Sequence, residues 1–335
     1  MEIGQSRNSL VTRDEGFGFH SRVRNLHTHS TARAHVDRIR ILSDEEAMTG
    51  FGRFTYPYYR AVLGEMLRSG RMVAMGAFLR SEAIGLVLAE LQESKRKAAI
   101  CSIAVASQQR RTGIATVLLR EVERELVIRG CRLAEIIYMT ERPSTPAVEG
   151  LLRKSGWPEA NCRLMICSSD FDLLSQAPWM RQTDFPAGFE VFRWQDLADH
   201  ERIEILESQE KRPWFPEVLS PFDHENQMEP CCSLGLRHRE RVIGWCIGDR
   251  LGADTLRCSS LFVGEQFAAQ GRAITLLARS IHASRGIGRP NFTFDVSFQR
   301  PLMIQFVQRR MTPYLKSIRI TKESRKTLDS ECLAA

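Results

Sequence analysis

The sequence lacks long hydrophobic runs and any regular pairing of its cysteines. No apolar stretch approaches the ~20 residues that cross a bilayer, and residues 1–33 lack the apolar core of a secretory signal. The nine cysteines show no zinc-ligand spacing and no C-x-x-C pair, so reduced thiols are expected. These absences predict a cytoplasmic protein with no membrane span and no metal.

A strong excess of either charge is also missing. There are 47 Lys and Arg residues against 40 Asp and Glu, a formal net charge of +7. The basic residues are interspersed with acidic ones, and there is no zinc finger, aromatic RNA-binding strand or basic helix beside heptads, so no nucleic-acid partner is expected. Four early histidines have no carboxylate or Cys partners at ligand spacing and predict no metal site: His20, His27, His29 and His35.

The chain has 335 residues, about twice the usual length of one domain, so two domains are expected. Residues 1–34, which are polar and rich in Arg, His, Ser and Thr, predict a disordered tail. Segments containing Pro and Gly mark a linker at 171–187. The sequence therefore predicts domains at 35–170 and 188–320, followed by a charged tail at 321–335.

An internal repeat relates the two halves. Each opens with an aromatic residue before a proline, Pro57 or Pro216. An Ile-Gly pair follows, whose glycine lies 28 positions after that proline, at Gly85 and Gly244. An acidic residue comes five positions later in both halves, and a Gly-x-Ala run opens a later apolar helix pattern. This spacing predicts a duplicated fold.

Each half predicts a mixed α/β sheet. In the first half, β patterns precede an apolar stripe at helical spacing that is closed by Gly130. A further strand and helix follow, so a crossover helix is expected to cover one face of the sheet. The predicted strands are 71–79, 82–91, 98–105 and 132–139, and the predicted helices are 113–129 and 145–155.

The turn before the helix at 113–129 holds the residues most suited to binding an anion. The start of a helix has unpaired N–H groups and the positive end of the helix dipole, which favour a phosphate or pyrophosphate. Gly113 and Ala115 leave room for close approach, and Arg110 and Arg111 add cationic donors. The Lys of a Walker A loop and the G-x-G-x-x-G pattern are missing, which disfavours nucleoside triphosphate transfer and dinucleotide binding.

Arg110-x-x-Gly113-x-Ala115 resembles the Gln/Arg-x-x-Gly-x-Gly/Ala signature of the GNAT superfamily of acyl-CoA-dependent N-acyltransferases. The run from Leu151 to Trp157 resembles the helix-to-Gly-aromatic ending of that family. The resemblance implies two tandem GNAT-like domains and a pantetheine thioester donor, either acyl-CoA or the phosphopantetheine of an acyl carrier protein. It places the donor on Ile103, Ala104, Val105, Arg110, Arg111, Thr112, Gly113, Ile114 and Ala115.

The second copy departs from the signature. Ala268 stands where the family has Gln or Arg, although Gly271 and Ala273 are kept, and the Gly-aromatic ending is absent. We interpret this half as a degenerate copy that supports the first and helps to dock the acceptor.

Several aromatic and proline-containing segments resemble tandem GNAT proteins of cyanobacterial type. Some of those proteins acylate Lys or ornithine side chains of ribosomally made peptides, in some cases with long fatty chains. The resemblance implies a primary-amine acceptor, with a peptide as one candidate, and an acetyl or longer acyl group. The segments are 138–146, 214–216, 219–222 and 229–230.

Amine attack on a thioester needs a base for the amine and an acid for the leaving thiolate. Strand order favours Glu90 as the base, and Tyr138 is the best substitute for the family's late-helix Tyr, which is Leu152 here. Both also fit structural roles, as a strand-end polar residue and a core aromatic. A CoA-binding sensor and a pure scaffold stay open, whereas Cys101 lacks a His partner and is interpreted as a packing residue.

Overall fold

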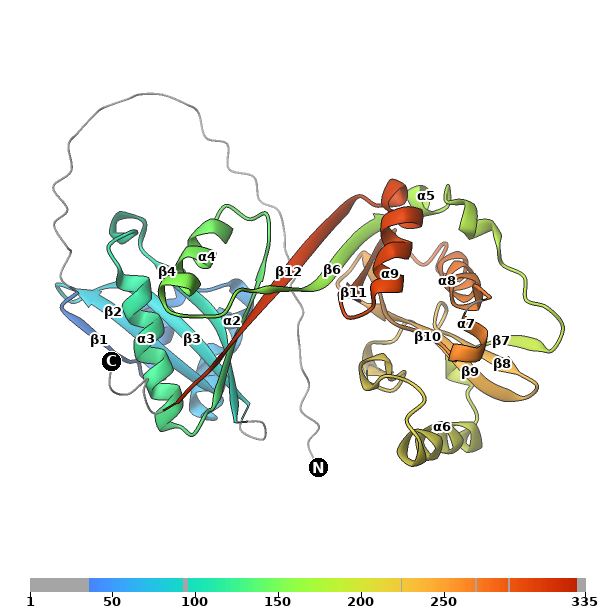
Figure 1. The fold of residues 1–335 in the computed structure, drawn as a ribbon, viewed down its shortest axis with the longest axis horizontal. Coiled ribbons are helices and arrows are strands. Elements are labelled where there is room, and N and C mark those ends of the chain that lie inside the picture. The colour runs from blue at the N-terminus through green and yellow to red at the C-terminus, as the bar shows by residue number, and fades with distance from the viewer. Residues whose placement is uncertain (1–35, 93–95, 224, 269, 289, 330–335) are drawn as a thin grey trace, which may run out of the picture. The chain divides into compact units, whose positions relative to one another are not determined.

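The computed structural model describes residues 36–92, 96–223, 225–268, 270–288 and 290–329. The tail expected at 1–34 lies outside the described residues. Within these residues, twelve strands form one mixed sheet in the order β1-β2-β3-β4-β5-β12-β6-β11-β10-β9-β8-β7 (Figure 1). This confirms the predicted mixed α/β fold.

The first half has the elements that its sequence predicts, with ends that differ by at most one residue. Strands β3 and β4 pair antiparallel, and β4 and β5 pair parallel with helix α3 between them. The elements are β1 (Arg38–Ile41), α1 (Asp44–Gly50), α2 (Pro57–Arg68), β2 (Met72–Leu79), β3 (Glu82–Gln92), β4 (Lys97–Val105), α3 (Ile114–Ile128), β5 (Leu133–Met139) and α4 (Thr145–Lys154).

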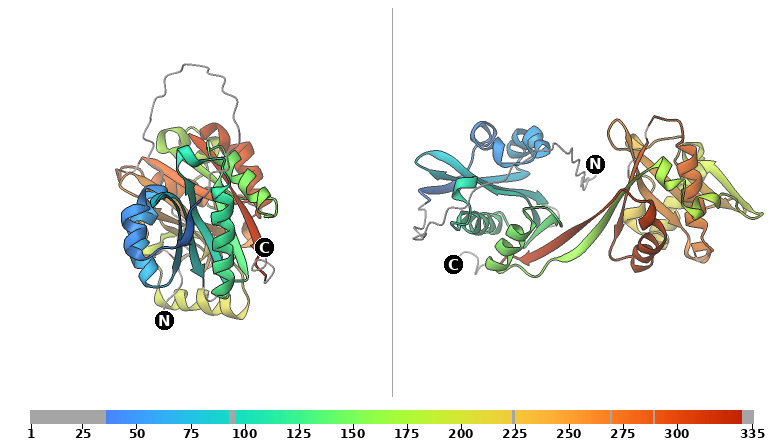
Figure 2. Two further views of the ribbon diagram at one scale, coloured as in Figure 1. Left: turned by 90° about the vertical axis from the view of Figure 1, so that its left-hand side faces the viewer. Right: turned by 90° about the horizontal axis from the view of Figure 1, so that it is seen from above.

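Helices cover both faces of the first half's sheet (Figure 2). Alternation along β3 sends Val87 to the face covered by α3 and α4, and Leu86 and Leu88 to the face covered by α1 and α2. Leu118 of α3 and Leu63 of α2 are fully buried in these two cores. We call the two surfaces the α3/α4 face and the α1/α2 face.

The second half repeats this order, as the spacing of its glycines predicts. Strands β9 and β10 form an antiparallel pair, and β10 runs parallel to β11 across helix α8. Its elements are α5 (Phe171–Leu174), β7 (Phe189–Arg193), α6 (Asp199–Lys211), β8 (Leu234–His238), β9 (Arg241–Arg250), β10 (Thr255–Val263), α7 (Glu265–Ala268), α8 (Arg272–Ala283), β11 (Asn291–Ser297) and α9 (Pro301–Phe306).

The two halves exchange their last strands. Strand β6 (Asn161–Asp170) follows α4 but pairs with β11, whereas β12 (Ser317–Thr327) follows the second half but pairs with β5. The two exchanged strands also pair with each other (Figure 1). The sheet of the second half is therefore completed by β6, which follows the first half in sequence. The sheet of the first half is completed by β12, which follows the second half.

The tail predicted at 321–335 is wrong for residues 321–327, which belong to β12. Its charged side chains suggested a solvated end, but three of them, Lys322, Arg325 and Lys326, have carboxylate partners in the first half. Lys326 Nζ lies 2.7 Å from Glu123 Oε2, and Lys322 Nζ lies 2.9 Å from Glu149 Oε1. Leu328 is then buried in the core of the first half.

The linker predicted at 171–187 contains ordered structure. It begins with α5 and continues through a 3₁₀ turn at Pro178–Arg181. Trp179 and Met180 of this turn are buried in a core cluster with Ile304. The segment is therefore packed against the second half along part of its length, because its apolar residues join that core.

Candidate functional site

Strands β4 and β5 separate after their first four residues and leave a gap between them. The two strands pair in parallel only over residues 97–100 and 133–136. Residues 102–105 of β4 still pair with β3, so the edge of β4 that faces β5 has no strand partner there. A β-bulge places the extra residue Cys101 where the gap begins. The backbone groups of Ile103, Ala104 and Val105 follow along this edge.

The loop after β4 turns into α3 through Gly113. Gly113 has φ of 96°, in the left-handed region, and a Cβ placed there would meet no atom within 4 Å. The first hydrogen bond into the helix runs from Val117 N to Gly113 O at 3.1 Å. The N–H groups of the first helical turn, including those of Ile114 and Ala115, therefore have no acceptor within the helix. Together they form an open donor site with the positive end of the helix dipole.

The two arginines of the loop are exposed. Arg110 Nε donates a hydrogen bond to the carbonyl oxygen of Val105 at 3.2 Å, which ties the guanidinium to the end of β4. Thr112 Oγ1 donates to Gln109 O at 2.7 Å and braces the turn. The structure thus brings the residues named for donor binding into one continuous edge, loop and helix start, with cations beside the open N–H groups.

Glu90 lies on the α1/α2 face, beside the start of the gap. It is paired across the strands with Ala99, whose methyl side chain supplies no counter-charge. Burial raises the pKa of the Glu90 carboxyl, and the Arg71 guanidinium opposes this effect. A half-buried carboxyl with a raised pKa is suited to accept a proton near neutral pH.

Tyr138 lies on the opposite, α3/α4 face of the sheet, where it packs against the core of α3. Its hydroxyl donates to Glu149 Oε1 at 3.3 Å, and Lys322 of β12 donates to the same oxygen at 2.9 Å. Burial raises the pKa of Tyr138, Glu149 raises it further, and Lys322 opposes both. The structure does not bring Tyr138 and Glu90 together. Leu152 is buried in the same core as Tyr138 and supplies no polar group.

Two residues of the α1/α2 face were not assigned a catalytic role from the sequence. Tyr59 of α2 is partly buried in the same cluster as Cys101. Burial raises the pKa of the Cys101 thiol to about 11, so it is a neutral thiol at physiological pH. This agrees with its interpretation as a residue that is not a nucleophile. Helical spacing was the available signal for Tyr59, because Leu63 and Met66 on the same stripe are buried.

The second half keeps the backbone of the site but not its chemistry. Gly271 has φ of 72° before α8, and β10 and β11 pair only over residues 255–258 and 291–294. Asp249, which corresponds to Glu90, is buried, and its Oδ2 lies 2.7 Å from Arg257 Nη2. Because Arg257 stands where the first half has Ala99, this carboxylate is held in an ion pair.

Aromatic side chains fill the second half's equivalent of the α1/α2 face. The register of β9 and β10 places Phe262 where the first half has Ala104. Its ring lies 5.0 Å from that of Trp245 and 5.4 Å from that of Trp214, measured between centroids. Trp245 is fully buried. These rings occupy the space beside the gap, which supports the interpretation of this half as degenerate.

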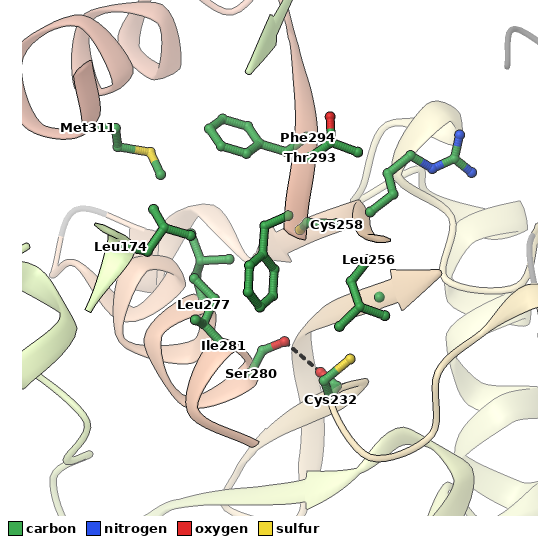
Figure 3. Close-up of a pocket in the computed structure, with 13 residues that line it drawn as sticks. Leu174, Cys232, Leu256, Cys258, Leu277, Ser280, Ile281, Thr293, Phe294 and Met311 are labelled. Atoms are coloured by element: carbon green, nitrogen blue, oxygen red, sulfur yellow. Dashed lines mark hydrogen bonds between the residues drawn. The ribbon is translucent and has the colours of Figure 1, made fainter. Parts of the chain in front are cut away.

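A small cavity of about 30 Å³ lies between α8 and the strands β10 and β11 (Figure 3). Apolar side chains such as Leu277 and Phe294 line most of it, and the Ser280 hydroxyl beside it donates to the Cys232 carbonyl oxygen. All of its lining residues belong to the second half, and none of them is among the residues named for donor binding or catalysis.

Two classes of feature are missing from the described residues. They contain no group of three or more His, Cys, Asp or Glu side chains placed to hold a metal ion. None of the described helices is long and apolar enough to cross a membrane.

Comparison with known proteins identifies the family. Residues 38–157 match the model of the acetyltransferase (GNAT) family, whereas no curated protein matches the sequence. A tandem GNAT protein from the clavulanic acid biosynthesis pathway, solved without AcCoA, is 12% identical, with a TM-score of 0.57 over 87% of this chain and 98% of its own. A GCN5-related N-acetyltransferase from Sphaerobacter thermophilus is 16% identical, with a TM-score of 0.58 over 87% of this chain and 95% of its own.

These identities are low, so the two structures show the fold alone, and the family model covers only residues 38–157. The tandem arrangement agrees with the internal repeat. The chain therefore has two GNAT folds in tandem, and its residues 38–157 match the acetyltransferase (GNAT) family.

Proposed function

We propose that the first half transfers an acyl group from the thioester of acyl-CoA to a primary amine, with Glu90 as the base. One observation carries this proposal. The donor-rich loop at Gly113, the open edge of β4 and the half-buried Glu90 follow one another along the same gap. No corresponding uncommitted carboxylate exists in the described part of the second half, where Asp249 pairs with Arg257.

The loop fits the pyrophosphate of CoA. Free N–H groups at the start of α3 and the exposed Arg110 and Arg111 supply charge-assisted donors, and Gly113 leaves space in front of them. The open edge of β4 from Val105 to Cys101 runs for roughly 13 Å at ~3.3 Å per residue, and its amides suit the amide groups of the pantetheine arm. An acyl carrier protein presents the same arm and fits this edge equally well.

Glu90 would take the proton that the amine loses during attack. The raised pKa of Glu90 brings the carboxyl closer to neutral pH, where a base is most effective. Tyr138, the acid that the sequence suggests, would act from the α3/α4 face, where its hydroxyl already donates to Glu149. The gap also holds amine and thioester close together, which by itself accelerates the reaction.

The acceptor that we propose is a Lys or ornithine side chain of a ribosomally made peptide. The support is the resemblance to tandem proteins that modify such chains, and a half-buried base suits an amine on a long flexible stem. A CoA-binding sensor is the second candidate, because the buried Leu152 replaces a polar residue with an apolar one.

Thiol release distinguishes these functions. Full-length protein would be incubated with acetyl-CoA or a longer acyl-CoA, with and without peptides that contain Lys or ornithine, and free CoA thiol would be measured. An acyltransferase releases thiol in proportion to amine, and mass spectrometry finds the acyl group on the peptide. Binding of CoA by calorimetry without amine-dependent release would support the sensor and refute the acyltransferase.

A further inference from the structure

Three polar side chains lie next to one another on the α1/α2 face of the first half. Cys101 Sγ lies 4.0 Å from Glu90 Oε2 and 3.2 Å from the carbonyl oxygen of Ala99. The Tyr59 side chain forms a hydrogen bond with the same thiol. Burial raises the pKa of Tyr59, and the neighbouring Cys101 and Glu90 raise it further. The thiol therefore stands between the phenol and the carboxyl.

The surroundings of this group are apolar. The core on this face contains Leu63, Met66, Leu86 and Leu88, all of them buried. Three polar groups in such a cluster cost desolvation free energy. A packing role alone does not require polar atoms at these positions.

The place of the group in the fold connects it with the gap. Cys101 is the bulged residue of β4, and the pairing of β4 with β5 ends at Ile100 and Ile136. The group therefore lies at the closed end of the gap, at the far end of the open edge from the Gly113 loop. A donor held along that edge by its pantetheine arm presents its thioester toward this end.

We propose that Tyr59 is a second catalytic residue, which gives the leaving CoA sulfur its proton, and that the Cys101 thiol links Tyr59 to Glu90. This inference rests on the proposed acyl transfer. It replaces Tyr138 as the acid, because Tyr59 shares a face with Glu90 and Tyr138 does not.

The acyl transfer needs no proton donor or acceptor besides Glu90, Cys101 and Tyr59. The amine nitrogen bonds to the thioester carbon, the carbon–sulfur bond breaks, and its electron pair stays on sulfur. Glu90 takes the proton from nitrogen, and the Tyr59 hydroxyl gives its proton to sulfur. The proton on Glu90 passes to Cys101 sulfur as the thiol proton passes to the Tyr59 oxygen. The group is restored, and one proton has moved from amine to CoA.

The link explains how a phenol with a raised pKa can act as the acid. A phenolate left alone in this apolar cluster would be strongly disfavoured. The proton that Tyr59 loses is replaced in the same step by a proton from Glu90, which passes through the Cys101 thiol. No phenolate forms, and the net proton donor to the CoA sulfur is the carboxylic acid of Glu90. Cys101 stays a thiol throughout, as its own raised pKa requires.

Tyr59→Phe and Tyr58→Phe form a matched pair. The two rings are neighbours on α2, 5.2 Å apart between centroids, but Tyr58 is exposed and Tyr59 is partly buried. Loss of the Tyr59 hydroxyl is expected to lower kcat ~10²-fold, the typical value of one acid catalyst, with unchanged CoA affinity and melting temperature. Tyr58→Phe is expected to keep the wild-type rate.

Position 101 tests the link. Cys101→Ser keeps a group that both accepts and donates a proton, whereas Cys101→Ala does not. We expect the Ala variant to lose kcat by about as much as Tyr59→Phe, and the Ser variant to retain most of its rate. Equal rates in the Ser and Ala variants would overturn the link, and an unchanged rate in Tyr59→Phe would overturn the inference. Failure of the wild-type protein to release thiol with amine would instead refute the proposed function itself.

Discussion

Gly113 is the residue on which donor binding depends most directly. Its left-handed backbone turns the chain so that the N–H groups of the next residues are open, and nothing occupies the space beside it. Gly113→Asp would place a negative side chain against a pyrophosphate. We expect a loss of ~2 kcal/mol or more in CoA binding, about thirtyfold in Kd by calorimetry, from repulsion and lost charge-assisted hydrogen bonds.

Gly130 provides the matched control for this substitution. It also has a positive φ, 82°, lies at the other end of α3 and has no atom within 4 Å of a Cβ. Gly130→Asp therefore introduces the same charge and a similar backbone strain away from the loop. If both variants bind CoA equally, the loop at Gly113 is not the anion site.

Glu90 has a pH dependence that follows from its raised pKa. As a base it must be ionised, so kcat of the wild type falls as pH drops through that pKa. Glu90→Gln is expected to lower kcat ~10²-fold and to remove this acidic limb, with CoA affinity unchanged. A variant that keeps its rate and its acidic limb would leave substrate positioning as the only source of catalysis.

The same residue predicts a stability change of defined sign. Because folding raises the pKa of Glu90, its ionised form is disfavoured in the native state. Its favourable contribution is present below the unfolded pKa of about 4.3 and is lost as pH rises through the folded value. Glu90→Gln is therefore expected to melt above the wild type at pH 8, with no difference at pH 4.

Sequence reasoning located the residues whose roles depend on local structure. Arg110 and Gly113 are recognisable because a loop, a glycine and a helix start are contiguous. Glu90 followed from strand order. Tyr59 and Cys101 were missed as a pair because their contact depends on how α2 packs over a bulge, which no local pattern specifies.

At the scale of elements, β12 stabilises the first half through a buried ion pair. Lys326 Nζ contacts Glu123 Oε2 at 2.7 Å and donates to the Ser155 carbonyl oxygen at 2.9 Å. Glu123, which also accepts a hydrogen bond from Trp157, is buried. The strand thereby joins the helices α3 and α4 to the edge of β5.

Lys326→Met removes this cation and leaves the carboxylate of Glu123 buried without it. We expect a loss of ~2 kcal/mol or more in the free energy of unfolding by urea titration. Lys211→Met breaks the exposed pair with Glu207 on α6 and is expected to cost less than ~0.5 kcal/mol. Equal small losses would mean that β12 is only loosely attached to the first half.

Most element bounds in the first half were predictable, because β patterns and the apolar stripe of α3 are local signals. Strand β12 was not predicted. Its charged residues match a solvated tail, and their partners, such as Glu123 and Glu149, are more than 150 positions away in the sequence. The exchange of β6 and β12 likewise has no signature in either segment.

At the scale of the whole molecule, the exchange makes the halves depend on each other. A fragment 36–187 keeps β6 but lacks β12, the partner of β5, and a fragment 188–329 lacks β6, the partner of β11. We expect each fragment expressed alone to be insoluble, and co-expression to yield a soluble complex that purifies together. A stable, soluble fragment 36–187 that binds CoA by calorimetry would contradict this dependence.

The two halves also differ in what their loops can bind. Gly271 repeats the backbone turn of Gly113, but the second half has Ala268 in place of a cationic residue, and its carboxylate Asp249 is neutralised by Arg257. Activity should therefore depend on one half, although the fold depends on both.

Amine-dependent release of CoA thiol from acetyl-CoA by the full-length wild type, Gly113→Asp and Gly271→Asp tests this account most directly. We expect release by the wild type and near wild-type release by Gly271→Asp. For Gly113→Asp we expect kcat/KM to fall at least ~10-fold, because thirtyfold weaker donor binding lowers kcat/KM. Loss of release in a folded Gly271→Asp protein, with release retained in Gly113→Asp, would place the active site in the other half and contradict the account.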